Sequence, residues 1–240
     1  MARVWKSLGV GAAAAVVAAV AVAGHNAVDN TITGEDRGHI EAFLQSAQVA
    51  PPRAPRSYEA EIAFIADVQR AVLDKVSGHE PIDFDLSREP GDVLAAGTGE
   101  CYDRSRLIEK ALSLAGFETR HVAVYSTEET GSALVSLVTP QVSSHALTEV
   151  RTRRGWLLVD SNDPWLSLDA GGDPVDAGRL QAAVASGGVE WHAGQRGRMN
   201  WIFEKPFTFV YGLYSRHGRF FPPFNRVPDI HYGEFAQNFF

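Results

Sequence analysis

The spacing of the apolar residues changes near the middle of the chain, and this change constrains the fold more than any other feature. From Cys101 to Gly116, apolar residues recur at helical intervals along one face. After Gly116 the interval becomes two over four segments of strand length, which are separated by turn-forming residues and span 119–126, 133–138, 144–150 and 156–160. A helix followed by consecutive strands joined by short turns predicts an α+β fold, with the helix packed on an antiparallel sheet.

Two more helical patterns precede this unit. A short amphipathic segment with apolar residues at positions 40, 43, 44 and 47 ends before the prolines at 51, 52 and 55. A longer helix is predicted from Tyr58 to Val76, because Ser57 can cap it and acidic residues occupy its first turn. Residues 79–99 read as a loop, and residues 180–186 as a short helix within a Gly- and Ala-rich stretch.

The last forty residues are rich in aromatic side chains, with thirteen Phe, Tyr and Trp residues from Trp201 to Phe240. Such a density indicates burial or a binding surface.

The predicted organisation of the chain has four parts: an export segment at 1–24, a helical or linker segment at 25–56, a core at 57–168, and an extension at 169–240 that packs on the core or covers its cleft.

Residues 1–24 have the pattern of a targeting segment. Arg3 and Lys6 precede an uncharged run from Leu8 to Ala23, and the small residues at positions 21 and 23 fit a signal-peptidase site. An uncleaved anchor is the alternative, with residues 8–23 as the candidate for membrane attachment. We expect an exported protein that is periplasmic or extracellular, or anchored to the cytoplasmic membrane and facing outward.

The formal net charge of −7 argues against nucleic-acid binding, which calls for a basic face. The histidines of the second half, such as His192, His217 and His231, are too scattered to suggest a metal site. We expect neither a metal nor a cofactor.

Cys101 is the only cysteine of the chain. In an exported protein, a cysteine kept for stability would usually have a disulfide partner. Cys101 begins the helical pattern instead, where peptide N–H groups favour an anion, and the thiolate is the reactive form of cysteine. Taken alone it could be a small buried hydrophobe; its position makes it a candidate nucleophile.

A cysteine nucleophile needs a base and an orienting group, and two neighbouring strands can supply them. If a short turn places Arg151 opposite Trp156, then Asp160 lies on the same face as His145, one diagonal step away. Asn162 stands opposite His145 in this register and is a competing orienter.

Two other side chains are candidate neighbours of this site: Tyr102, which follows the cysteine, and Trp156, on the strand of Asp160. Each of the three triad candidates has an ordinary structural explanation by itself. Their combination in this arrangement favours a catalytic role for all three.

Five sequence motifs occur in a characteristic order: Gly99-Glu100-Cys101, Leu114-Ala115-Gly116-Phe117, Arg120-His121-Val122, His145-Ala146 with Glu149, and Gly155-Trp156 before Val159-Asp160. Over roughly residues 90 to 165 the chain resembles the transglutaminase-like superfamily, which has a papain-like fold. The resemblance implies that Cys101 is the nucleophile, His145 the general base and acid, and Asp160 the orienter. Leu147, where an aromatic residue is common, and the sequence Tyr102-Asp103-Arg104 depart from the usual pattern.

The resemblance implies a thiol-dependent acyl-transfer enzyme, which is a cysteine peptidase, an amidase or a transglutaminase-like acyltransferase; the pattern of residues 1–24 adds that it is exported. It would hydrolyse or transamidate an amide bond of a peptide or protein through a thioester on Cys101, and the size of the chain favours hydrolysis. Two alternatives are a non-catalytic papain-like scaffold that binds a peptide or a cell-envelope partner, and a membrane-tethered maturation factor.

Overall fold

A four-stranded antiparallel sheet forms the centre of the protein, in the order β3-β2-β1-β4. The computed structural model describes residues 17–240 apart from 52–56, 84–85, 140, 196–198 and 216–228. The central strands are β1 (Thr119–Ser126), β2 (Ser144–Thr152), β3 (Gly155–Asp160) and β4 (Phe207–Tyr211). A second, two-stranded sheet contains β5 (Leu213–Tyr214) and β6 (Asp229–Ile230).

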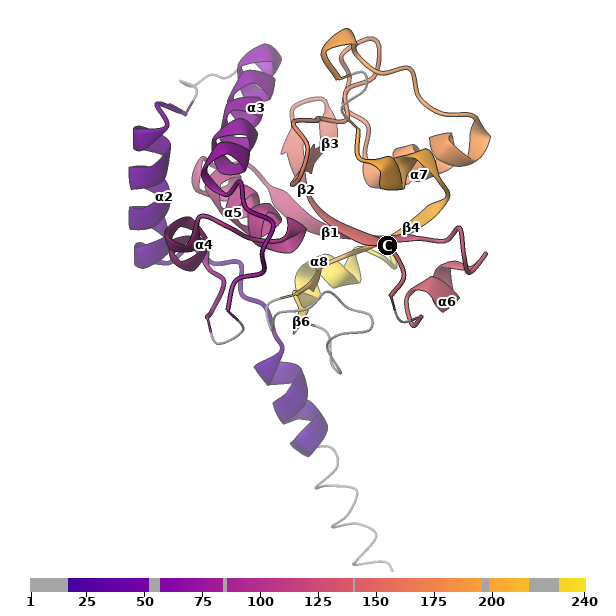
Figure 1. Cartoon of the computed structure of the whole chain (residues 1–240), viewed down its shortest axis with the longest axis horizontal. Coiled ribbons are helices and arrows are strands. Elements are labelled where there is room, and N and C mark those ends of the chain that lie inside the picture. Colours follow the sequence, from indigo (N-terminus) through magenta and orange to yellow (C-terminus); the bar gives the residue numbers. More distant parts are fainter. Residues whose placement is uncertain (1–16, 52–56, 84–85, 140, 196–198, 216–228) are drawn as a thin grey trace, which may run out of the picture.

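Helices cover both faces of the central sheet. The helices are α2 (Gly34–Ser46), α3 (Tyr58–Lys75), α4 (Pro90–Ala96), α5 (Cys101–Leu114), α6 (Ala133–Ser136), α7 (Ala177–Ser186) and α8 (Tyr232–Ala236), with 3-10 turns η1 (Ala193–Gln195) and η2 (Trp201–Glu204). Helices α2, α3, α4 and α5 lie on one side and α7 lies on the other (Figure 1). The α+β class and the predicted packing of the Cys101 helix on an antiparallel sheet are confirmed.

The described residues form three buried apolar clusters, and the two larger ones hold these layers together. The first lies between α5, α3 and the sheet, and it includes Leu107, Ile108, Ala111, Leu112, Val150, Leu157 and Val159, all without measurable exposure. The second lies on the opposite face, where side chains of β1, β2 and β3 meet Trp165, Leu180 of α7 and Phe203 of η2. Burial of such side chains contributes about 1.5–3 kcal/mol each, so both faces of the sheet are anchored.

One predicted strand is wrong. Residues 133–138 contain the short helix α6, and Leu134 and Val138 are 77% and 70% exposed. Ser132 caps this helix by accepting a hydrogen bond from the N–H of Val135, and Thr139 donates to the carbonyl of Val135. An alternating pattern over so short a segment cannot distinguish a strand from one capped helical turn.

The fourth strand comes from the aromatic extension. β4 pairs with β1 along five residue pairs, from Val122–Tyr211 to Ser126–Phe207. Apolar and polar residues alternate at the start of Phe207–Tyr211, as is typical of a strand. This strand was not predicted, because aromatic residues are dense throughout the extension. The predicted loop 79–99 also contains a helix, α4, which has Pro90 in its first turn and ends at Gly97 with a φ of 64°.

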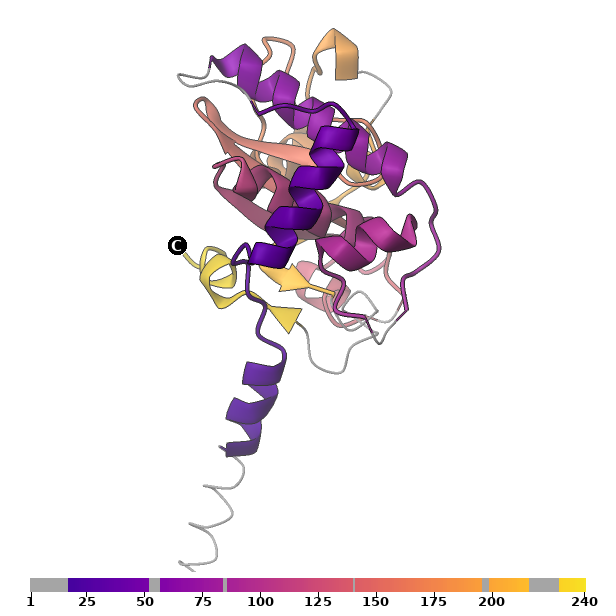
Figure 2. The same cartoon turned by 90° about the vertical axis from the view of Figure 1, so that its left-hand side faces the viewer.

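A helix at residues 17–25 projects away from the body of the protein (Figure 2). Its Val17 and Val20 are exposed. Most of the predicted export segment, residues 1–16, lies outside the described residues. Among the residues that are described, no helix is long and apolar enough to cross a membrane.

Candidate active site

Cys101 is the first residue of α5, and the chain ahead of it is fixed by Asp103. The Asp103 carboxylate accepts a hydrogen bond from the Glu100 N–H at 2.9 Å and binds the Arg88 guanidinium at 2.9 Å. A side chain on Gly99 would approach the Asp103 Cβ within 2.9 Å, so this position has room only for glycine. Because the first N–H groups of a helix have no partner within it, the backbone at Cys101 can donate to an anion.

His145 and Asp160 meet in the predicted register. Arg151 pairs with Trp156 across β2 and β3, and Leu147 pairs with Asp160. His145 Nε2 then reaches Asp160 Oδ1 diagonally at 3.1 Å, and both side chains are buried. The predicted placement of His145 and Asp160 on one face of the sheet, one diagonal step apart, is confirmed.

The ring of His145 lies between Asp160 and Cys101. Burial lowers the pKa of His145, but the charge and hydrogen bond of Asp160, with a hydrogen bond to the Cys101 side chain, raise it to about 10. Since Nε2 binds Asp160, Nδ1 is the nitrogen left for the sulfur. The arrangement favours a protonated imidazole next to the thiol.

The Asp160 carboxylate is held by the turn that follows it. Its Oδ1 accepts hydrogen bonds from the N–H groups of Asn162 at 2.7 Å and Asp163 at 3.0 Å, in addition to the bond from His145. Within the described residues, the buried Oδ2 has no hydrogen-bond partner. These bonds fix the orientation of the carboxylate.

Gln69 of α3 is a support that the sequence did not reveal. Its amide nitrogen lies within hydrogen-bond distance of three carbonyl oxygens, those of Asp160 (2.8 Å), Asp163 (3.1 Å) and Trp165 (2.8 Å). Gln69 is 2% exposed, and it adjoins the apolar stripe of α3. A polar residue beside an apolar stripe is the signal that could have identified it.

The aromatic extension supplies a wall for His145. The Phe203 ring meets the His145 ring edge-on with centroids 6.4 Å apart and stacks on Trp165 at 5.6 Å. Trp191 and Phe207 continue this cluster. Sequence reasoning left the role of the extension open, and only the fold shows which aromatic residue reaches the histidine.

Asn162 and Tyr102 both lie at the site, Asn162 in a role other than the predicted one. The Asn162 side chain accepts a hydrogen bond from Arg104 rather than orienting His145. Tyr102 is buried in the same apolar cluster as Cys101, and its ring lies 5.2 Å from the Arg88 guanidinium carbon. Burial raises the pKa of Tyr102 to about 12.

Trp156 does not border the site. It lies at the opposite end of β3 from Asp160, four residues or roughly 13 Å along the strand, where the Arg120 guanidinium lies 4.1 Å from its ring centroid. Sharing a face with Asp160 did not imply proximity. Tyr125 of β1, which sequence reasoning missed, is buried near the thiol, and burial and the charge of Cys101 raise its pKa well above the usual value.

The comparisons with known proteins agree with this geometry. Residues 53–161 match the family model described as the transglutaminase-like superfamily. This segment is similar to a transglutaminase-like core. The proposed nucleophile, base and orienter all lie within the matched segment.

The comparisons with curated proteins and with solved structures add little to this similarity. No curated protein matches the chain significantly. Seven chains of solved structures match, among them a crystal structure of Rad4-Rad23 bound to a 6-4 photoproduct UV lesion, with a TM-score of 0.36 and 11% identity. That alignment covers 62% of this chain and 39% of the other, so the present chain spans about two fifths of its length.

A second buried polar group, which we call the carboxyl cluster, joins α5 to the C-terminal extension and consists of Glu109, Tyr214 and Glu234. The Tyr214 hydroxyl lies 2.7 Å from Glu109 and 3.1 Å from the nearer oxygen of Glu234. One hydroxyl hydrogen cannot serve two carboxylates. Burial, reinforced by the charge of Glu109, raises the pKa of Glu234 to about 8, and burial also raises the pKa of Glu109.

The carboxyl cluster joins distant parts of the chain. Asn30 donates hydrogen bonds to Tyr214 and to Glu234, while Glu234 of α8 accepts the N–H of His121 in β1. The His121 ring stacks on Tyr214 at 4.1 Å. His121, which the resemblance includes, therefore supports the back of α5 rather than the thiol.

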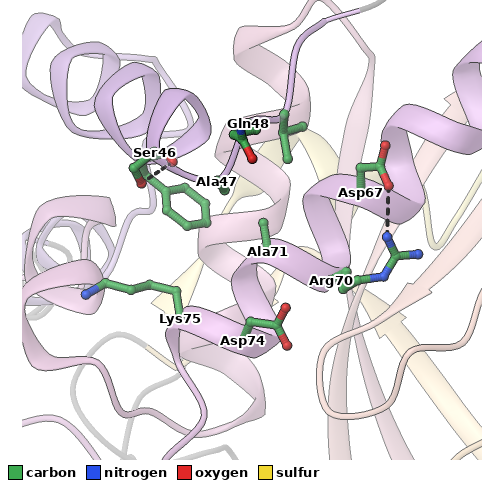
Figure 3. A pocket seen from close by; sticks show the side chains of 10 residues that line it. Ser46, Ala47, Gln48, Asp67, Arg70, Ala71, Asp74 and Lys75 are labelled. Atoms are coloured by element: carbon green, nitrogen blue, oxygen red, sulfur yellow. Dashed lines mark hydrogen bonds and ion pairs between the residues drawn. The ribbon is translucent and has the colours of Figure 1, made fainter.

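A surface pocket outside the triad region contains fewer groups that could react or bind a ligand. Figure 3 shows a pocket of about 480 Å³ between α2 and α3, where Asp67 and Arg70 form an exposed ion pair at 3.0 Å. Its Ser46 hydroxyl donates to the Phe43 carbonyl. In the described part of the chain, no group of three or more His, Cys, Asp or Glu residues could hold a metal ion.

Proposed function

We propose that the protein is a thiol-dependent acyl-transfer enzyme that cleaves or transamidates an amide bond of a peptide or protein through a thioester on Cys101. The observation that carries this proposal is the His145 ring, bound by Asp160 at 3.1 Å on one nitrogen and facing Cys101 with the other. The match of residues 53–161 to a superfamily of generally cysteine-dependent enzymes supports the same class.

In the first half of the reaction, the Cys101 thiolate attacks the carbonyl carbon and a tetrahedral oxyanion forms. The Cys101 backbone N–H, at the start of α5, is suitably placed to donate to this oxyanion. His145, whose pKa is raised to about 10, carries the proton that the departing amine needs. The C–N bond breaks, the amine leaves with that proton, and a thioester remains on the sulfur.

In the second half, His145 takes a proton from the incoming nucleophile, which attacks the thioester and releases the thiolate. Water gives a hydrolase and an amine gives a transamidase. The aromatic wall of Phe203 and Trp165 limits the approach to His145 on one side. We propose hydrolysis as the main reaction.

We also propose that the chain is exported, with residues 8–23 acting as the signal or anchor. The pattern of Arg3, Lys6 and the uncharged run supports this, as does the exposed apolar helix at 17–25. Spheroplasts of an expressing bacterium would be treated with protease while intact. A chain that is degraded only after lysis would contradict export.

Alkylation of Cys101 by iodoacetamide tests the proposed chemistry. Because Cys101 is the only cysteine, the mass of the folded protein reports its labelling directly, and Cys101→Ser is the unlabelled control. The alkylation rate would be measured from pH 5 to 8 for the native protein and for His145→Ala. We expect the native rate at pH 6 to exceed that of the variant at least about tenfold, because a free thiol ionises near pH 8.5. Equal profiles that follow an ordinary thiol would favour the non-catalytic scaffold instead.

A further inference from the structure

Arg104 is a buried cation one helical turn after Cys101. Its exposure is 1%, and residues three apart on a helix lie on the same side. Burial lowers the pKa of Arg104, whereas the charges of Cys101, Glu100, Asp103 and Asp160 raise it. Its guanidinium therefore lies within electrostatic range of both the proposed nucleophile and the orienting carboxylate.

The guanidinium connects two segments that must be aligned for the chemistry. On the Cys101 side, its Nη1 donates to the Gly99 carbonyl at 2.5 Å. On the Asp160 side, its Nε donates to the Ser161 carbonyl at 2.6 Å and its Nη2 donates to Asn162 Oδ1. The backbone N–H of the same Asn162 binds the Asp160 carboxylate.

A third segment, the turn after α3, completes the set of partners. Nη1 also lies 3.1 Å from the Gly78 carbonyl and 3.4 Å from the Val76 carbonyl, and Nη2 lies 3.3 Å from His79 Nδ1. Every one of these partners is an uncharged group if His79 is neutral. Among the described residues, no carboxylate forms an ion pair with Arg104.

Two other buried arginines show the contrast. Arg88 binds the Asp103 carboxylate at 2.9 Å, and Arg106 binds Glu89 at 3.1 Å. A buried charge is normally paired, because removing it from water is costly. The opposite charges near Arg104 are those of Cys101, Glu100, Asp103 and Asp160, in that order, and two of these four belong to the proposed triad.

We propose that Arg104 is a positioning residue of the Cys101 site: it joins the loop before the nucleophile to the turn after Asp160, and its unpaired charge favours the thiolate. The inference rests on the proposed thiol chemistry. Other titratable or charged groups face this region from each neighbouring element. They are Glu100 just before α5, Asp103 of α5, His79 of the turn after α3, Tyr125 of β1, His145 of β2, Asp160 at the end of β3, and Asp163 in the turn that follows.

Two substitutions separate the charge of Arg104 from its geometry. Arg104→Gln removes the charge and keeps one donor group, whereas Arg104→Lys keeps the charge and loses the planar fork. Arg70→Gln, in an exposed pair with Asp67, gives the same change of net charge elsewhere. The pH midpoint of iodoacetamide alkylation and the melting temperature would be measured for each folded protein.

We expect both Arg104 variants to melt at a lower temperature, because the bridging hydrogen bonds weaken. The midpoint should rise by about one pH unit in Arg104→Gln alone, since an opposite charge near a thiolate shifts its ionisation by that order. Arg104→Lys and Arg70→Gln should keep the native midpoint. An unchanged midpoint in folded Arg104→Gln, or equal shifts in both Arg104 variants, would overturn the inference.

Asn162→Asp keeps the test decisive if Arg104→Gln does not fold. This isosteric change places a carboxylate on Nη2 of Arg104 and neutralises its charge, so the midpoint should again rise; no rise would overturn the inference. The native protein separates this question from the proposed function. If the native profile is that of an ordinary thiol, the proposed function fails; if only the variants show no shift, the role of Arg104 alone fails.

Discussion

The carboxyl cluster should make the stability of the protein depend on pH through Glu234. The folded state raises the pKa of this side chain from 4.5 to about 8, mainly through burial, with the charge of Glu109 as the next cause. Between these values the folded chain binds a proton that the unfolded chain releases. The free energy of unfolding therefore falls as the pH rises through this window.

The expected size follows from the width of the window. One pKa unit corresponds to about 1.4 kcal/mol, so Glu234 should cost about 2 kcal/mol of stability between pH 6.5 and 8. The opposite contribution of His121, whose pKa is lowered from 6.5 to about 3, adds only about 0.4 kcal/mol above pH 6.5, and it is common to the native protein and to any variant of Glu234. The raised pKa of His145 adds a loss of the same sign, but that loss is common to the native protein and to any variant of Glu234.

Glu234→Gln isolates the effect, because glutamine stays neutral and can still accept the His121 N–H. Urea unfolding at pH 6.5, 7, 7.5 and 8 should show a shallower loss of stability in this variant, by about 2 kcal/mol over the range. Glu118→Gln is the matched control, since Glu118 is 62% exposed. Parallel curves for the native protein and Glu234→Gln would refute the raised pKa of Glu234 in the folded state.

Two further predictions concern the site itself. Asp160→Asn should lower the pKa of His145 and reduce the rate of Cys101 alkylation at pH 6 at least about tenfold. The control is Asp163→Asn, whose side chain lies 3.1 Å from that of Asn200, and it should alkylate at a rate near that of the native protein. Equal rates in all three proteins would show that Asp160 does not set the protonation state of His145. Phe203→Ala should lower the free energy of unfolding, measured in urea, by about 3–5 kcal/mol, because removal of a buried ring leaves a cavity. The control Trp201→Ala changes a residue that is 54% exposed and should cost less than about 1 kcal/mol. Similar losses in both variants would contradict the burial of Phe203 against His145 and Trp165.

The sequence predicted the chemistry-bearing strands better than the surroundings of the helix. Strand parity alone brought His145 and Asp160 to one face in the observed register, because side chains alternate strictly along a strand. The same rule placed Trp156 on that face but could not tell that it lies at the far end.

The helix α5 shows why the rest was not predictable. Its sequence has an apolar stripe and a charged remainder, the pattern of a helix with one solvated face. In the structure, Asp103, Arg104, Arg106, Glu109 and Lys110 are all buried. Their partners come from α2 and the segment before it, the residues just before α4, the turns after α3 and β3, and the C-terminal extension. No local pattern reveals that such distant residues will cover a charged face.

The late position of β4 has a consequence for how the molecule is made. Residues 127–206 separate β1 from the strand that covers its outer edge, and Phe203, next to His145, lies in the same late part of the chain. While the polypeptide is being synthesised, β1 therefore has an unpaired edge, and the pocket around the histidine has an open wall, until these residues emerge. Thiol reactivity should appear only after the extension has folded back, so a nascent or truncated chain would carry its cysteine without the means to use it.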